Sequence, residues 1–70
     1  MTPTQIDQLI PSAWNVHDAA RNKAVPDPIT GLLRDALWQL EDALDVAHPN
    51  PQPFAESVLL ALAVVGWCLG

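Results

Sequence analysis

Residues 28–48 read PITGLLRDALWQLEDALDVAH and decide the fold. Apolar residues recur through this stretch at steps of three and four, the spacing that lines one face of an α-helix. Placed at about 100° per residue, they fill a single arc that must be core or interface. We therefore expect a long amphipathic helix over residues 28–48, with the apolar members Ile29, Leu32, Leu33, Ala36, Leu37, Leu40, Ala43, Leu44 and Ala47.

The N-terminal residues carry a helix start signal. Thr2, Pro3 and Gln5 match an N-cap, a first-turn proline and a capping-box acceptor. In such a box the threonine and glutamine side chains each bond the other residue's backbone N–H. The signal predicts a short helix over residues 3–10.

Pro11 is expected to stop or kink this first helix, because proline has no backbone N–H to donate. Ser12 can cap a second helix, predicted over residues 12–23. Residues 24–28 are expected to form a loop, since the residue before a proline avoids the helical region.

The C-terminal part is a proline-rich connector followed by a nearly continuous apolar segment. Residues 49–53 hold too many prolines to be helical, so the chain is expected to reverse there and form a helical hairpin. A helix is predicted over residues 53–69. Because this helix is apolar on every side, we expect the long helix and a second copy of the chain to bury it. A membrane span is disfavoured, since the twelve apolar residues from Val58 to Leu69 lack flanking Lys or Arg and a span needs about 20.

Size favours self-association. A chain of 70 residues forms a single domain, 1–70, and buries only about 60% of the surface that its unfolded form exposes. With one cysteine and no metal-ligand cluster, a second copy is the simplest source of further buried surface. The expected fold is all-α: a small helical hairpin or three-helix unit that forms a homodimeric bundle. Its core and dimer residues are expected to be Leu33, Leu37, Leu40, Leu44, Phe54, Val58, Leu62 and Val65.

The charge of the chain is acidic and uneven. Eight acidic and three basic residues give a net charge of −5 and a pI near 4.4, so direct binding to nucleic acid is not expected. From Asp35 onward there are five acidic residues and neither Lys nor Arg. No secretory signal precedes the first helix and Cys68 has no disulfide partner, so the cytoplasm is the expected location.

No spacing typical of an enzyme or metal site occurs. His17, His48 and Cys68 lie in different segments, and metal-binding or nucleophile motifs are absent. His17 and Asp18 are adjacent, but neighbouring residues on a helix point in different directions, so they are not expected to act as a relay pair. We expect no enzyme activity, no cofactor and no metal.

Trp38 is the candidate for partner contact, because it lies opposite the apolar arc of its helix among charged residues. Two alternatives would make it structural: the first helical segment covers it, or Arg34 stacks on its ring. Otherwise it is a binding hot spot, and the acidic residues around it dock on a basic groove of a partner or simply keep the protein soluble. Trp67, by contrast, is expected in the core. The predicted partner-binding residues are Trp38, Arg34, Glu41, Asp42 and Asp45.

The residues Trp14-Asn15, Arg34-Asp35-Ala36-Leu37, Leu40-Glu41 and Ala43-Leu44 resemble a pattern found in small helical proteins by which temperate phages disarm their hosts. The pattern is similar to that of a dimeric quorum-sensing anti-activator, and anti-CRISPR proteins are an equal alternative. The resemblance implies a helical dimer that binds a host regulator or motor protein and blocks it.

These observations predict a small acidic protein-binding module, an inhibitor from a phage or other mobile element that occupies the surface of a host bacterial protein or complex. Two other classes fit the sequence. A structural subunit would only dimerise or assemble and would have no separate target. A short membrane-associated peptide would use its apolar C-terminal segment to bind lipid.

Overall fold

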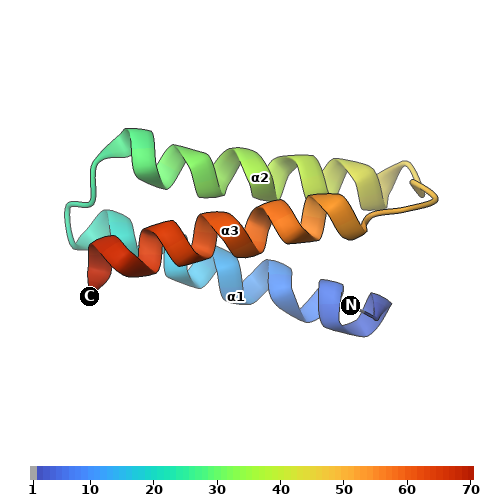
Figure 1. Ribbon diagram of the computed structural model, residues 1–70, viewed down its shortest axis with the longest axis horizontal. Helices are drawn as coiled ribbons and strands as arrows, with labels where there is room; N and C mark the ends of the chain where they lie inside the picture. Colours follow the sequence, from blue (N-terminus) through green and yellow to red (C-terminus); the bar gives the residue numbers. More distant parts are fainter. Residues whose placement is uncertain (1) are drawn as a thin grey trace.

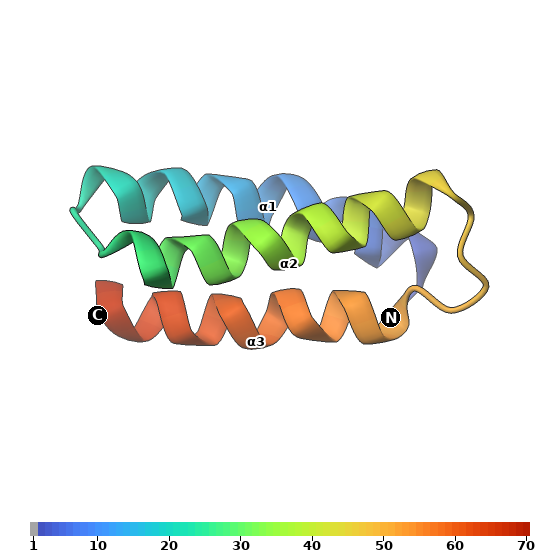
Figure 2. The same ribbon diagram turned by 90° about the horizontal axis from the view of Figure 1, so that it is seen from above.

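The computed structural model describes residues 2–70 as three α-helices with no strand in that range. Helix α1 spans Pro3–Asn22, α2 spans Asp27–Asp45 and α3 spans Gln52–Leu69. The helices run alternately in opposite directions and lie side by side, so the C-terminal end of α3 meets the start of α2 (Figures 1 and 2). The all-α prediction is confirmed, in its three-helix form.

The predicted start of α1 is confirmed atom by atom. The backbone N–H of Gln5 donates to Thr2 Oγ1 at 3.2 Å, and the backbone N–H of Thr2 donates to Gln5 Oε1 at 2.9 Å. Pro3 follows as the first helical residue. Thr2 and Gln5 therefore satisfy two backbone N–H groups that would otherwise lack partners.

The predicted stop at Pro11 is wrong, because α1 continues through it from Pro3 to Asn22, and the alternative of a kink at Pro11 stays a prediction. Pro11 and Asp7 are both exposed, so water can hydrate the Asp7 carbonyl that loses its helical donor. Ser12 is consequently an exposed residue inside the helix and caps nothing. Residues 3–10 and 12–23 form one element because its inner face packs on the other two helices.

Helix α2 ends at Asp45, three residues before the predicted end at His48. Ala47 adopts a positive φ of 53°, and the backbone N–H of His48 reaches back to the carbonyl of Ala43 at 2.8 Å. This is the geometry of a Schellman ending, which usually places glycine where Ala47 stands. The connector accordingly begins earlier than predicted, at Val46, and gives way to α3 at Gln52.

The end of α1 repeats this arrangement. Ala24 has a φ of 60°, and the backbone N–H of Val25 donates to the carbonyl of Ala20 at 3.0 Å. Val25 and Ala20 are both buried, which supplies the apolar contact that accompanies such endings. The first loop is therefore shorter than the predicted 24–28, since α2 already starts at Asp27.

The core lies between the inner faces of the three helices. The structure places three of the expected core residues of α2 and two of α3 at complete burial: Leu33, Leu37, Leu40, Val58 and Val65. Leu44, Phe54 and Leu62 are partly buried and pack against that cluster. Helix α1 adds Ile6, Ala13 and Ala20. These residues are thus buried within one copy of the chain.

Candidate functional site

Trp38 stands on the outer face of α2 and is open to solvent. The guanidinium carbon of Arg34, one turn earlier, lies 5.5 Å from the centre of the Trp38 ring, within the range of a cation–π contact. The predicted stacking by Arg34 is therefore present. It nevertheless leaves 55% of the Trp38 surface exposed, so the contact orients the indole without hiding it.

The three acidic residues predicted beside Trp38 do not behave alike. Glu41 is half-buried, and its Oε1 accepts a hydrogen bond from Trp14 Nε1 of α1 at 3.3 Å. Asp42 and Asp45 are exposed, and neither forms an ion pair within residues 2–70. Glu41 therefore links α1 to α2. The remaining residues, the half-buried Arg34 and the exposed Trp38, Asp42 and Asp45, are here called the Trp38 surface.

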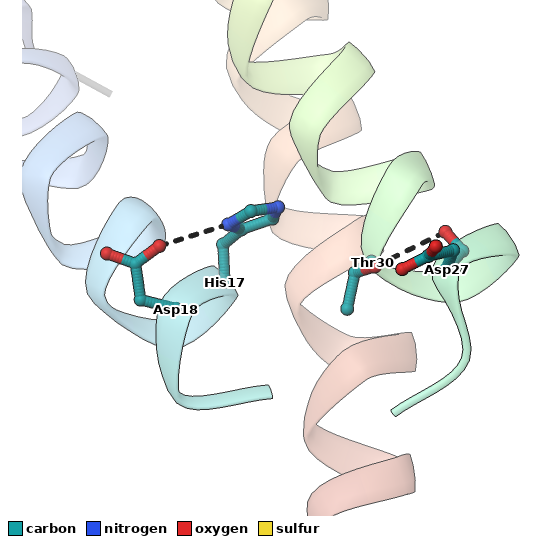
Figure 3. Close-up of polar contacts among 4 residues, drawn as sticks. All are labelled: His17, Asp18, Asp27 and Thr30. Carbon is teal, nitrogen blue, oxygen red and sulfur yellow. Dashed lines mark hydrogen bonds and ion pairs between the residues drawn. The ribbon is translucent and has the colours of Figure 1, made fainter. Parts of the chain in front are cut away.

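His17 is a buried polar residue at the centre of the bundle. Its ring points from α1 toward the other two helices, as Figure 3 shows, and it is 3% exposed. Nδ1 contacts Oδ1 of Asp18 at 3.3 Å, and the ring meets Trp14 edge-on at 5.2 Å. Nε2 is buried without a hydrogen-bond partner in residues 2–70. His17 and Asp18 are thus in contact although they are adjacent on the helix, but the imidazole is buried and only the Asp18 carboxylate is exposed.

The other residues that could act as nucleophiles or metal ligands do not form a cluster among residues 2–70. Thr30 is fully buried, and its hydroxyl donates to the carbonyl of Asp27 at 3.3 Å, a bond at the start of α2 (Figure 3). Cys68 is exposed as a free thiol. Over the part of the chain that the structure describes, no three His, Cys, Asp or Glu side chains are grouped to hold a metal ion.

Within the single chain, α3 is not buried on every side, and its predicted burial by a second copy stays a prediction. Trp67, expected in the core, is 87% exposed, and Leu60 is 71% exposed. Val64 and Leu59 are exposed as well. Only α1 and α2 pack on α3, and two neighbours cover one side of a helix, so the remaining side meets solvent whatever its composition.

Four of the outward residues of α3 form a stripe at helical spacing: Leu60, Ala63, Val64 and Trp67. Leu32 of α2, 55% exposed, extends the stripe across to the neighbouring helix. Beside it runs a groove of about 490 Å³, lined by Leu32, Asp35, Ala36, Gln39, Ser57, Leu60, Ala61 and Val64. We call Leu32, Leu60, Ala63, Val64 and Trp67 the apolar surface. The three- and four-residue steps from Leu60 to Trp67 were the signal for a second face on this helix.

Helix α3 also passes a simple test for a membrane span. Over Gln52–Leu69 its length and composition suffice to cross a bilayer, and 22% of that window is buried in the fold. This helix begins one residue before the predicted range 53–69. Its inner residues Val58 and Val65 are fully buried against the other helices, so insertion into lipid would remove part of the core.

The two surfaces lie on different sides of α2. Leu32 and Trp38 are six positions apart, which at about 100° per residue separates them by about 120° around the helix. One surface is aromatic with an acidic rim, and the other is uncharged apart from Asp35 at its edge. No family model, curated protein or solved structure was found to match the chain.

Proposed function

We propose that the chain is a small protein-binding module that uses the Trp38 surface to occupy a basic patch on a larger protein and block it. The observation that carries this proposal is the indole of Trp38, more than half exposed beside two free carboxylates. Tryptophan within a polar rim is the composition of binding hot spots. The folded chain itself gains little from a tryptophan in that position, since its core is complete without it.

The acidic residues of the Trp38 surface favour a partner with a basic surface. Asp42 and Asp45 stand in the last turn of α2, where no basic residue accompanies them. Acidic residues at a helix C-terminus cost about 0.3–1 kcal/mol each, because they add to the negative end of the helix dipole. The same placement concentrates negative potential next to Trp38, which attracts a basic surface and speeds the encounter. The net charge of −5 repels nucleic acid itself.

A blocking role fits this chemistry better than catalysis. A basic groove that normally holds nucleic acid or another acidic ligand is closed once an acidic helix lies across it. The resemblance to phage-encoded inhibitors favours such a target in the bacterial cytoplasm. In the histidine–carboxylate contact of residues 2–70, Asp18 is exposed but the His17 ring is buried, so a substrate has no access to the imidazole.

Affinity capture from bacterial lysate tests the proposal when variants are compared side by side. The immobilised chain should retain a basic protein that Trp38→Ala and the double variant Asp42→Asn/Asp45→Asn lose by at least tenfold. The double variant Asp7→Asn/Glu56→Gln removes the same charge from exposed positions elsewhere and should retain the protein. Capture should also weaken as salt rises, because screening shortens the reach of the acidic residues.

Circular dichroism separates loss of binding from loss of fold. All three variants should keep the helix content of the parent, and the asparagine double variant should unfold at a slightly higher midpoint because it removes two charges from the negative end of α2. If Trp38→Ala unfolds the chain, the residue belongs to the core. Capture by the asparagine double variant alone then tests whether the Trp38 surface binds the partner. Equal capture by that variant and by the Asp7/Glu56 control would refute a role for the Trp38 surface.

A further inference from the structure

We propose that two copies of the chain associate through the apolar surface, with their α3 helices antiparallel and crossing at Ala63 and Val64. This inference is independent of the proposed function, because the Trp38 surface lies on another side of α2. Four large apolar side chains of the apolar surface are exposed: Leu32, Leu60, Val64 and Trp67. Grouped on one side of a small protein, they form a contiguous patch of the kind that marks an interaction site.

The stripe on α3 is self-complementary. Leu60 and Trp67 lie symmetrically on either side of the adjacent pair Ala63 and Val64. In an antiparallel pair of helices centred there, Trp67 of one copy lies opposite the partner's Leu60, and Ala63 lies opposite the partner's Val64. Such a twofold arrangement uses the same patch on both copies. The small Ala63 at the centre lets the helices approach to the 8–10 Å typical of close packing.

The groove beside the stripe can receive the tryptophan of the other copy. Trp67 projects almost fully from α3, and the groove between α2 and α3 has Leu60 and Leu32 in its walls. Asp35 and Gln39 on the α2 side offer acceptors to the indole N–H, which needs a partner once buried. The projecting Trp67 and the apolar groove that can receive it thus lie on the same surface, as a twofold-symmetric pair requires.

Charge favours a second copy over a lipid surface. From Ser57 to Leu69 the chain contains no Asp, Glu, Lys or Arg, so two copies can approach along α3 without like-charge contact. From Asp35 to Gly70 there is neither Lys nor Arg, and interfacial helices rely on such residues to hold anionic headgroups.

The available area suffices for a weak dimer. With the crossing at Ala63 and Val64, the two α3 helices overlap over residues 58–69, which corresponds to a length of about 18 Å. With α2 alongside, the face is about 20 Å wide, or about 360 Å² in projection. The accessible area of side chains exceeds this projection but stays below the about 800 Å² per partner of a standard interface, a size typical of weak association.

Sedimentation velocity on the purified chain tests the association. The mass should rise from 7.6 kDa toward twice that value as concentration increases from about 1 μM to about 1 mM. Leu60→Asp should weaken dimerisation at least tenfold, whereas Val46→Asp, which adds the same charge at an exposed valine outside the apolar surface, should not. A monomer at the highest concentration, or equal effects of both variants, would overturn the proposal.

Cysteine cross-linking tests the antiparallel geometry. With the crossing at Ala63 and Val64, the two Cys68 residues stand about 13 Å apart along the helices, beyond the about 7 Å limit between Cα atoms for a disulfide. Under a mild copper–phenanthroline oxidant, the double variant Ala63→Cys/Cys68→Ser should form disulfide dimers readily and the parent chain slowly. Rapid dimers from Cys68 alone would mean a parallel pair and contradict the arrangement.

Vesicle sedimentation distinguishes a lipid occupant. The parent chain should remain in the supernatant with phosphatidylcholine vesicles. Co-sedimentation that Leu60→Asp abolishes would show that this surface binds lipid, and the proposal of a second copy would fail.

Discussion

Helices α2 and α3 are of similar length and pack against each other, yet their outer faces are opposites. The inner faces of both are aliphatic and buried, with Leu37 and Val65 as examples. Outside, α2 presents Trp38 among charged residues, whereas α3 presents Leu60 and Trp67 with no charge in its last three turns. In the single chain, the outer face of α2 suits contact with water, whereas the apolar outer face of α3 is left uncovered.

An apolar residue on a helix can serve the folding of one chain or the association of two chains, and the spacing of apolar residues does not distinguish these roles. Burial of the inner faces holds the three helices together, and an apolar outer face contributes nothing to that until another molecule covers it. Stability of the folded monomer and self-association should therefore respond to different residues. Three changes, taken in order of decreasing effect, examine this separation.

The largest effect is expected from truncating the inner face of α2. Leu37→Ala should lower the free energy of unfolding by about 3 kcal/mol, because it removes buried methyl groups and leaves a cavity. Leu60→Ala, the same change on the outer face of α3, should alter the free energy of unfolding of the dilute monomer by less than about 0.5 kcal/mol. Urea unfolding followed by circular dichroism measures both. Similar losses in the two variants would erase the distinction between inner and outer faces.

A smaller effect, a gain in stability, is expected at His17, whose buried ring points from α1 toward the other two helices. His17→Phe should raise the free energy of unfolding by about 1 kcal/mol, because it removes the buried Nε2 that lacks a partner and keeps a ring against Trp14. Asp18 is exposed and its carboxylate can be hydrated instead. His17→Ala, which leaves a cavity, should cost about 2 kcal/mol. Destabilisation by both substitutions would indicate that Nε2 is bonded in solution.

The smallest effect concerns the connection between α2 and α3. Ala47→Gly should stabilise the chain by about 0.5 kcal/mol, since relief of the positive φ outweighs the extra freedom that glycine has in the unfolded chain. Ala24→Gly at the end of α1 should do the same. The outward-facing Ala63→Gly, inside α3, should instead destabilise by about 1 kcal/mol. Thermal unfolding with the three variants compared at equal concentration checks the signs.

Features governed by neighbouring residues were predictable from the sequence. The capping box of Thr2 and Gln5 involves four consecutive residues, and the structure reproduces it. The inner face of α2 follows from its three- and four-residue spacing, and Leu33, Leu37 and Leu40 are fully buried. In each case the physical requirement lies within one element.

Features that depend on contacts between helices could not be predicted from the sequence. Pro11 does not end α1, because packing of the helix on its neighbours outweighs one lost hydrogen bond. Trp67 was expected inside and is outside, because an all-apolar helix does not reveal which side its neighbours cover. For the candidate site, the sequence located Trp38 on an outer face but could not show that Glu41 turns to Trp14.

The short loops between the helices bear on the speed of folding. Four residues, 23–26, join α1 to α2, and six residues, 46–51, join α2 to α3, so each helix packs on its neighbours in the chain. Such local topology folds in microseconds to milliseconds, because little loop entropy is lost before contacts form. Each molecule should thus reach its folded shape well before it meets another, and pairing should depend on how much of the chain the cell makes.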